Sequence, residues 1–178
     1  MSDLARLLET HIPALRRYAR ALTRDVTRAD DLVQTCLVRA LDKQHLWQPG
    51  TNLRAWLFTI LHNLYVNDTR CALREGVRVG DESARSIPAV GPNAVLSLEL
   101  RDLERALTSL SEEQRQVILL VGLEGMRYET VASVLDIPVG TVRSRLSRGR
   151  NALRRMMDGR QRTMPGDQHK VGFDRRAA

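Results

Sequence analysis

A group of arginine and serine residues follows a short break between two apolar-periodic segments near the carboxyl end of the chain. Val131 and Leu135 face inward before the break, and Val142 and Leu146 face inward after it. This spacing is typical of a helix-turn-helix, whose second helix enters the major groove of DNA. Arginine can donate two hydrogen bonds to guanine, and serine can bond several base edges. Gly149 is expected to let the second helix fray or bend. The candidate base-reading residues are Arg143, Ser144, Arg145, Ser147 and Arg148.

The charge balance of the chain indicates the same kind of partner. The sequence has a formal net charge of +7 and 28 basic residues, of which all but Lys43 and Lys170 are arginine. Between residues 138 and 162 there are eight arginines, with Asp158 as the one acidic residue. A basic helix can also be a solvated face, so charge alone leaves both interpretations open. Combined with the helix-turn-helix spacing, the charge favours phosphate and base contacts in DNA.

The elements that must position these residues are all predicted to be helices. Apolar residues recur at helical spacing in the first seventy residues, and no segment shows the period of two that is typical of strands. The most regular stripe comprises Leu53, Trp56, Leu57, Ile60, Leu61 and Leu64. Pro13 is expected to break or start a helix, and Pro49 with Gly50 separates two of the stripes.

The chain is expected to form two small domains. Residues 71–94 lose the periodicity and gain glycine and proline, which is typical of a flexible linker. A leucine stripe then begins a second helical segment, and Ser111 with Gln114 predicts a capping-box start for the next helix. The stripe comprises Leu96, Leu100, Leu103, Leu107 and Leu110. We therefore predict an all-α protein with a helical bundle at 1–70, a linker at 71–94, a helix-turn-helix domain at 95–158 and a disordered tail at 159–178.

The sequence shows no motif for catalysis or for a cofactor. Cys36 and Cys71 form no Cys-x-x-Cys pair, the histidines are scattered, and no Gly-rich phosphate loop is present. We expect no metal, no cofactor and no enzymatic activity, with Cys36 a core residue rather than a redox sensor. No apolar run approaches about 18 residues and no signal peptide is recognisable. The sequence therefore predicts a cytoplasmic protein that does not insert into membranes.

Two blocks of the sequence resemble the extracytoplasmic-function (ECF) sigma factors of bacterial RNA polymerase. Residues 110–150 look like the domain of that family that binds upstream promoter DNA. Residues 29–34 and 49–63 resemble its polymerase-binding helix and its promoter-melting loop and helix. The blocks occur in the correct order within residues 5–157, which is more specific than a helix-turn-helix alone. The block that begins at Pro49 is similar to the general-stress-response branch.

The resemblance implies two further sites in the amino-terminal domain. The helix that contains residues 29–34 would dock on core polymerase through Asp30, Asp31, Leu32, Gln34, Leu37 and Arg39. A base flipped out at the minus-ten element would be captured by Thr51, Asn52 and Asn63. Trp47 could stack on a base, whereas Trp56 lies on the apolar stripe and fits the core. Two alternatives stay open: Asp30 and Asp31 could complement a helix dipole, and Asn63 could cap a helix.

The implied partners are core RNA polymerase, promoter DNA and an anti-sigma factor that masks both domains. On this interpretation the helix-turn-helix reads the minus-thirty-five element. Two other classes of protein remain open. One is a helix-turn-helix regulator that acts without stable polymerase binding. The other is a recombinase, which is disfavoured because the amino-terminal segment lacks strand and helix alternation.

Overall fold

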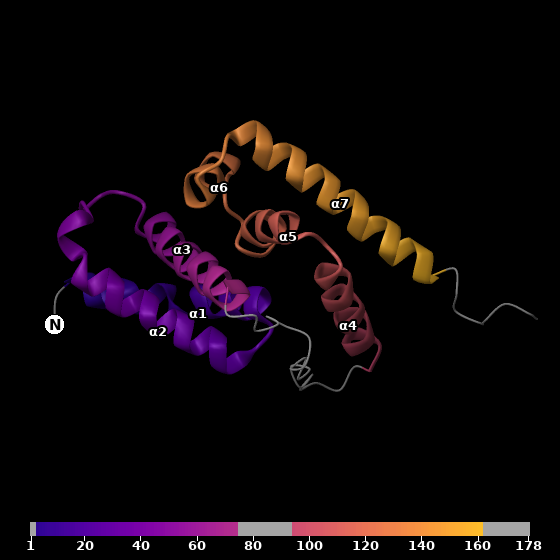
Figure 1. The fold of residues 1–178 in the computed structure, drawn as a ribbon, viewed down its shortest axis with the longest axis horizontal. Helices are drawn as coiled ribbons and strands as arrows, with labels where there is room; N and C mark the ends of the chain where they lie inside the picture. The colour runs from indigo at the N-terminus through magenta and orange to yellow at the C-terminus, as the bar shows by residue number, and fades with distance from the viewer. Residues whose placement is uncertain (1–2, 75–93, 162–178) are drawn as a thin grey trace, which may run out of the picture.

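The computed structural model describes residues 3–74 and 94–161, and every regular element in these two stretches is a helix. Figure 1 shows α1, α2 and α3 together in one group and α4 to α7 in a second. The all-α prediction is confirmed. The elements are α1 (Asp3–Thr23), α2 (Val26–Asp42), the 3-10 turn η1 (Gln44–Leu46), α3 (Leu53–Arg74), α4 (Ala94–Thr108), α5 (Glu112–Ile118), the π-helical η2 (Leu119–Leu123), α6 (Tyr128–Leu135) and α7 (Val139–Gln161).

The amino-terminal domain, α1 to α3, forms where the predicted apolar stripes meet. Side chains from all three helices are fully buried there. They include Leu15, Tyr18, Cys36, Leu57, Phe58 and Leu61. The start of α2 is fixed locally, because the Asp25 carboxylate accepts a hydrogen bond from the Arg28 N–H at 3.0 Å.

Pro13 neither breaks nor starts a helix, which corrects the sequence prediction. It lies inside α1, where it cannot donate the backbone hydrogen bond that the carbonyl of Glu9 would otherwise accept. Pro13 and Glu9 are both exposed, so water can satisfy that carbonyl. The amphipathic packing of α1 on α2 and α3 outweighs this local penalty.

The carboxyl-terminal domain begins with the predicted cap and continues in a way that the sequence did not indicate. Ser111 Oγ accepts a hydrogen bond from the Gln114 N–H at 3.4 Å at the start of α5. α5 then passes into η2, a π-helical turn that helical periodicity cannot distinguish from an α-helix. α7 runs through Gly149 to Gln161, so the expected fraying at Gly149 is wrong.

The leucine stripe of α4 is covered only near its carboxyl end. Leu110 is buried and Leu107 is partly buried, whereas Leu100 and Leu103 are 51% and 39% exposed. α4 packs on α7, which covers the end of the stripe but not its middle. The side chain of Leu96 lies outside the described residues.

The element boundaries bear on the predicted linker and tail. α3 continues through Arg74, so Cys71 is helical although the predicted linker includes it. Residues 75–93 of the predicted linker lie outside the described residues, and its last residue, Ala94, begins α4. α7 extends to Gln161, and the rest of the predicted tail, residues 162–178, is likewise outside them.

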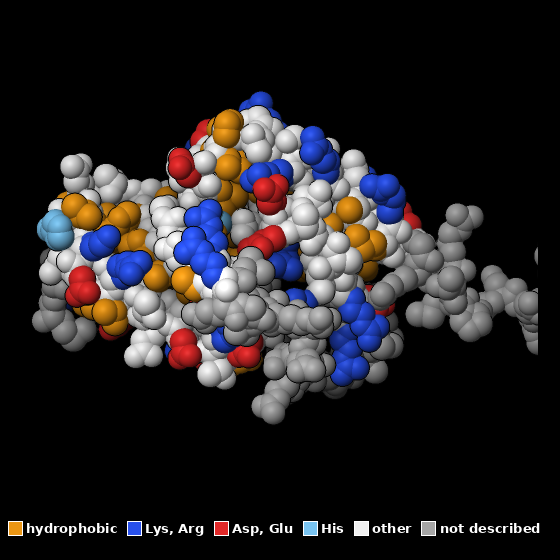
Figure 2. Space-filling model, in the orientation of Figure 1, with side chains coloured by type: hydrophobic (Ala, Val, Ile, Leu, Met, Phe, Trp, Pro, Cys, Tyr) orange, Lys and Arg blue, Asp and Glu red, His pale blue; other side chains and the backbone are white. Residues whose placement is uncertain are grey.

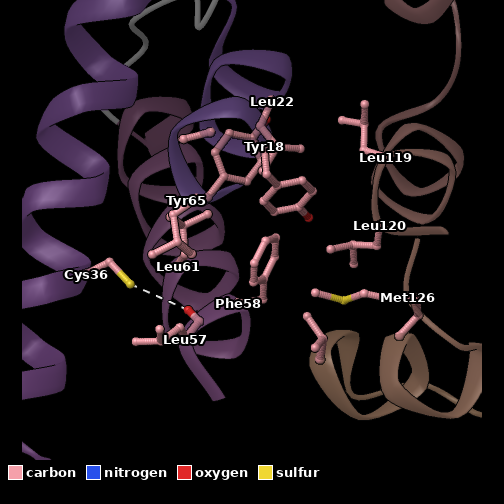
Figure 3. Packing of buried hydrophobic residues seen from close by; sticks show 14 of the residues in the cluster. Tyr18, Leu22, Cys36, Leu57, Phe58, Leu61, Tyr65, Leu119, Leu120 and Met126 are labelled. Carbon is pink, nitrogen blue, oxygen red and sulfur yellow. Dashed lines mark hydrogen bonds between the residues drawn. The ribbon is translucent and has the colours of Figure 1, made fainter. Parts of the chain in front are cut away.

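The two domains pack directly against each other. α3 lies beside α6, and buried residues from both domains form one apolar cluster. Figure 3 shows Tyr18 and Phe58 of the amino-terminal domain pointing toward Leu120 and Met126 of the carboxyl-terminal domain. The sequence predicted two domains joined through a linker, and their mutual packing is an additional finding.

Candidate nucleic-acid and polymerase interfaces

The helix-turn-helix consists of α6 and α7, joined by a three-residue turn at 136–138. Asp136 adopts the left-handed conformation with φ 52°, and the Ile137 N–H donates to the Ala132 carbonyl at 3.0 Å. The Pro138 carbonyl accepts from the Thr141 and Val142 N–H groups at 2.9 and 3.1 Å, which starts α7. These bonds fix the crossing of the two helices without a glycine in the turn.

The five candidate residues on α7 differ in their availability to DNA. Arg143, Ser147 and Arg148 are exposed. Ser144 is partly buried, and its hydroxyl donates to the Thr141 carbonyl at 3.0 Å. The side chain of Arg145 is 22% exposed and pairs with Glu113 of α5 at 2.9 Å. Figure 2 shows Lys and Arg side chains along the outer edge of α7. The helix therefore presents Arg143, Ser147 and Arg148 most openly.

The loop before α3 carries two of the residues expected to capture a base. Thr51 donates its hydroxyl hydrogen to the Gln48 carbonyl at 2.7 Å, and Asn52 accepts from the Ala55 N–H at 3.0 Å. Asn52 thus caps α3 with its side-chain oxygen. Both residues are exposed, so the loop is ordered by these bonds while its polar edge stays accessible.

Asn63 lies in the middle of α3 and is exposed. The sequence placed it at a helix end, which is wrong, and its alternative role as a helix cap is thereby excluded. Asn52 and Asn63 are eleven residues apart, which places them on the same face and about 16 Å apart along the axis. One base cannot contact both residues. A single strand that runs along this face can reach one and then the other.

The two tryptophans of the amino-terminal domain are both partly buried. Trp47 packs against the apolar cluster, and its indole nitrogen is buried without a hydrogen-bond partner among the described residues. Trp56 also packs against the cluster, seven residues before Asn63, and therefore near the same face of α3. Neither indole ring is fully exposed to solvent, so the polar residues Thr51, Asn52 and Asn63 are the more accessible part of this surface.

α2 carries the predicted polymerase contacts along its outer side. Asp31, Gln34 and Arg39 are exposed, whereas Leu32 and Leu37 are partly buried against the core. Asp30 lies 3.4 Å from the Arg16 guanidinium and 3.6 Å from that of Arg20. The helix dipole does not account for either aspartate, because α2 starts at Val26 with Asp25 as its cap and no acidic residue in its first turn.

Sequence reasoning missed the apolar part of the α2 surface. Val38 and Leu41 of α2 are 53% and 39% exposed, and Leu46 of the following η1 is 61% exposed. Val38 and Leu41 are four and seven residues after Gln34, a spacing that places all three on one side of a helix. This pattern could have predicted them from the sequence. Apolar side chains next to Gln34 give α2 a mixed surface of the kind that protein partners bury.

The titratable groups of this domain support structural roles. Burial raises the pKa of the Cys36 thiol to about 12, and its sulfur donates to the Leu57 carbonyl at 3.5 Å. Burial also lowers the pKa of His62 to about 4, which keeps the imidazole neutral. In the described part of the chain no cluster of three or more His, Cys, Asp or Glu residues could hold a metal. No described helix is long and apolar enough to span a membrane.

Two family models match the chain, one in each domain. The first is described as the Sigma2 domain of PhyR and matches residues 8–62, which contain all of α2. The second is described as Sigma-70, region 4, and matches residues 100–153, which contain α6 and most of α7. The ECF RNA polymerase sigma factor EcfG of Rhodopseudomonas palustris is 40% identical over 158 residues, covering 88% of this chain and 87% of that protein.

The chain belongs to the ECF family of RNA polymerase sigma factors. As a sigma factor, it is a non-catalytic subunit that binds core RNA polymerase and directs it to promoters. The ECF sigma factor SigE of Mycolicibacterium smegmatis is a second relative, 34% identical over 83% of this chain and 59% of its own length.

Solved sigma factors share the arrangement of both domains. The sigma factor RpoE of Bartonella quintana, solved with the anti-sigma factor NepR, matches with a TM-score of 0.76 and 37% identity over 89% of this chain and 98% of that one. CnrH, solved with the cytosolic domain of CnrY, matches with a TM-score of 0.65 and 29% identity over 87% of each chain. This sigma factor therefore has the two-domain fold seen in both structures.

Proposed function

We propose that this sigma factor reads both promoter elements and docks on polymerase through three separate surfaces. The observation that carries the proposal is that one chain exposes a basic helix of the helix-turn-helix on one domain and a polar face of α3 on the other. The first surface is α7 with Arg143, Ser147 and Arg148, and the second is the face of α3 that joins Asn52 to Asn63. The third is the outer side of α2.

At the minus-thirty-five element, α7 enters the major groove and its exposed arginines contact base edges and phosphates. Arg143 and Arg148 are both able to donate two hydrogen bonds to guanine. Such base contacts specify the sequence, whereas phosphate contacts carry no sequence information. Ser144 retains its hydroxyl oxygen as an acceptor while donating to Thr141. Arg145 supports the domain through Glu113 and contributes charge from a more enclosed position.

At the minus-ten element, the exposed face of α3 binds the strand that leaves the duplex. An unstacked base offers its edge to amide groups, and its capture stabilises the separated strands. Asn52 uses its oxygen to cap α3, so its amide NH₂ is the group available to a base. Asn63 has both its donor and its acceptor available on the same face, one base or more farther along the strand.

The similarity to EcfG and to RpoE bound to NepR supports two finer proposals. We place the protein in a stress-response branch of the family, held inactive by an anti-sigma factor that binds both domains. Because its DNA and polymerase partners are inside the cell, we also place it in the cytoplasm. An anti-sigma factor of the NepR kind from the same genome would be the matching partner to test.

Reconstitution with purified core polymerase tests the proposed function. The protein and core polymerase are mixed, their co-elution is measured, and transcripts from a promoter library are mapped with and without the protein. A stable complex that creates new start sites supports the proposal. Tight duplex binding without a polymerase complex would contradict the proposal.

A further inference from the structure

A buried carboxylate joins the two domains. Glu124 follows η2 in the carboxyl-terminal domain, and its side chain is fully buried. Arg17 of α1 donates to both carboxylate oxygens at 2.9 and 2.8 Å. Arg54 of α3 donates to the carboxylate at 2.7 Å and to the Glu124 carbonyl at 2.8 Å. Two cations of one domain thus neutralise one anion of the other, and the anion depends on them for its burial.

The apolar part of the same contact contains a feature that opposes it. Tyr18 packs on Phe58 with ring centroids 5.3 Å apart, and both point toward Leu120 and Met126 (Figure 3). The Tyr18 hydroxyl is buried there without a hydrogen-bond partner among the described residues. A buried hydroxyl without a partner favours the state in which water reaches it. The contact between the domains therefore combines a strong ionic centre with the energetic cost of burying the Tyr18 hydroxyl. Separation of the domains would remove that cost.

The packed arrangement is too small for the proposed function. The minus-ten and minus-thirty-five elements lie about 25 base pairs apart, or about 85 Å along B-DNA. A compact chain of this length has a radius of gyration of about 16 Å. The recognition helix α7, with 23 residues, is itself about 34 Å long. The two domains must therefore separate before one chain can contact both elements.

We propose that Glu124 is a latch that holds the unbound sigma factor closed through Arg17 and Arg54, and that the latch opens when polymerase separates the domains. This inference rests on the proposed function for its consequence, whereas the closed state is tested on the unbound chain alone. The latch does not cover the DNA-reading residues. It limits activity by holding the two reading surfaces too close together.

Single-molecule energy transfer between dyes on the two domains tests the latch. The dyes are attached at Lys43→Cys and Asn151→Cys in a Cys71→Ser background, because all three positions are exposed and Cys36 is fully buried. Glu124→Gln removes the charge at the interface. Glu113→Gln is the matched control, since Glu113 pairs with Arg145 inside one domain. Tyr18→Phe removes the orphan hydroxyl, and circular dichroism checks that each variant keeps its helices.

We expect the unbound wild-type chain to be mainly closed. Glu124→Gln should raise the ratio of open to closed molecules about tenfold or more, whereas Glu113→Gln leaves it unchanged. Tyr18→Phe should lower the ratio about fivefold. Adding core polymerase should convert the wild-type chain to the low-transfer state.

Two results would overturn the latch. One is an unbound wild-type chain whose domains are already apart, and the other is a Glu124→Gln variant with the wild-type distribution. A polymerase complex that keeps the high-transfer state would overturn the requirement for opening. Failure to bind polymerase at all would contradict the proposed function, while the energy transfer in the unbound chain would still support or overturn the latch independently.

Discussion

Gly149 of α7 lies against Ile118 of α5 so closely that a Cβ at position 149 would sit 2.5 Å from Ile118 Cδ1. Glycine in the middle of a helix costs about 1 kcal/mol relative to alanine, and here it permits α5 and α7 to approach each other. The residue that the sequence marked as a weak point of the recognition helix is therefore a packing position that fixes how α7 is held.

Gly149→Ala tests this contact, because its effect on the free energy of unfolding should change sign when Ile118 is shortened. In the wild-type background we expect the substitution to lower the free energy of unfolding by about 1 kcal/mol, because the displaced Ile118 costs more than the helix gains. Ile118→Val removes Cδ1. In that background Gly149→Ala should instead raise stability by up to about 1 kcal/mol. Urea unfolding of the four proteins measures the cycle, and equal effects in both backgrounds would contradict it.

Arg148 and Arg145 should respond differently to alanine. Arg148→Ala should weaken binding to the minus-thirty-five element by about 1–3 kcal/mol if it reads a base, with no change in thermal stability. Arg145→Ala should lower stability by no more than about 1 kcal/mol, because its partner Glu113 is largely exposed. Fluorescence anisotropy with cognate and scrambled duplexes separates the two. Unchanged discrimination by Arg148→Ala would remove it from the base-reading residues.

Asn63→Ala should impair strand opening without affecting polymerase binding. The side chain is exposed in the middle of α3, so its loss should change stability by less than about 0.5 kcal/mol. Permanganate reactivity of promoter thymines in the polymerase complex measures opening. Reactivity equal to that of the wild type, with the same amount of complex, would exclude Asn63 from the strand-binding face.

Val38→Asp, unlike Asn63→Ala, should impair polymerase binding. Val38 is 53% exposed on the outer side of α2, and a charge there should reduce affinity for core polymerase about tenfold or more. Val26→Asp is the control, because Val26 is 46% exposed at the first position of the same helix, where an acid is favourable. Binding by surface plasmon resonance compares them. Equal loss by both variants would show a general effect of charge rather than a local contact.

The buried imidazole of His62 makes stability depend on pH. Burial lowers its pKa from 6.5 to about 4, so the folded chain takes up the proton less readily than the unfolded chain. The contribution is fully present above pH 6.5 and is lost as the pH falls toward 4. Between pH 7.5 and pH 5 the loss is about 2 kcal/mol. Urea unfolding of His62→Gln should show a correspondingly smaller fall, and an identical fall would contradict this cause.

Local patterns predicted the helices and their buried faces well. Val131, Val142 and Leu146 follow helical spacing, and all three are buried at the helix-turn-helix as expected. Ser111 was recognised as a cap because a cap depends on residues three positions apart. The exposed leucines of α4 were less clear, because periodicity shows that residues share a face and not whether another helix covers it.

Contacts between residues that are far apart along the chain could not be predicted from the sequence. Glu124 meets Arg17 and Arg54 across the domain boundary, and nothing within a few residues of any of them indicates the pairing. Pro13 was misjudged because packing outweighs local preference. Asn63 was misplaced because the pattern did not show that α3 continues to Arg74. For Glu124 and Pro13 the deciding interaction comes from another helix.

The most direct test of the account is one footprint of the assembled complex at a promoter selected from the library. The full chain and core polymerase are incubated with the promoter, and nuclease protection and permanganate reactivity are read on the same DNA. We predict protection at the upstream element together with reactive thymines about 25 base pairs downstream, both lost without the protein. Upstream protection that needs no polymerase and is accompanied by no reactive thymines would contradict the account.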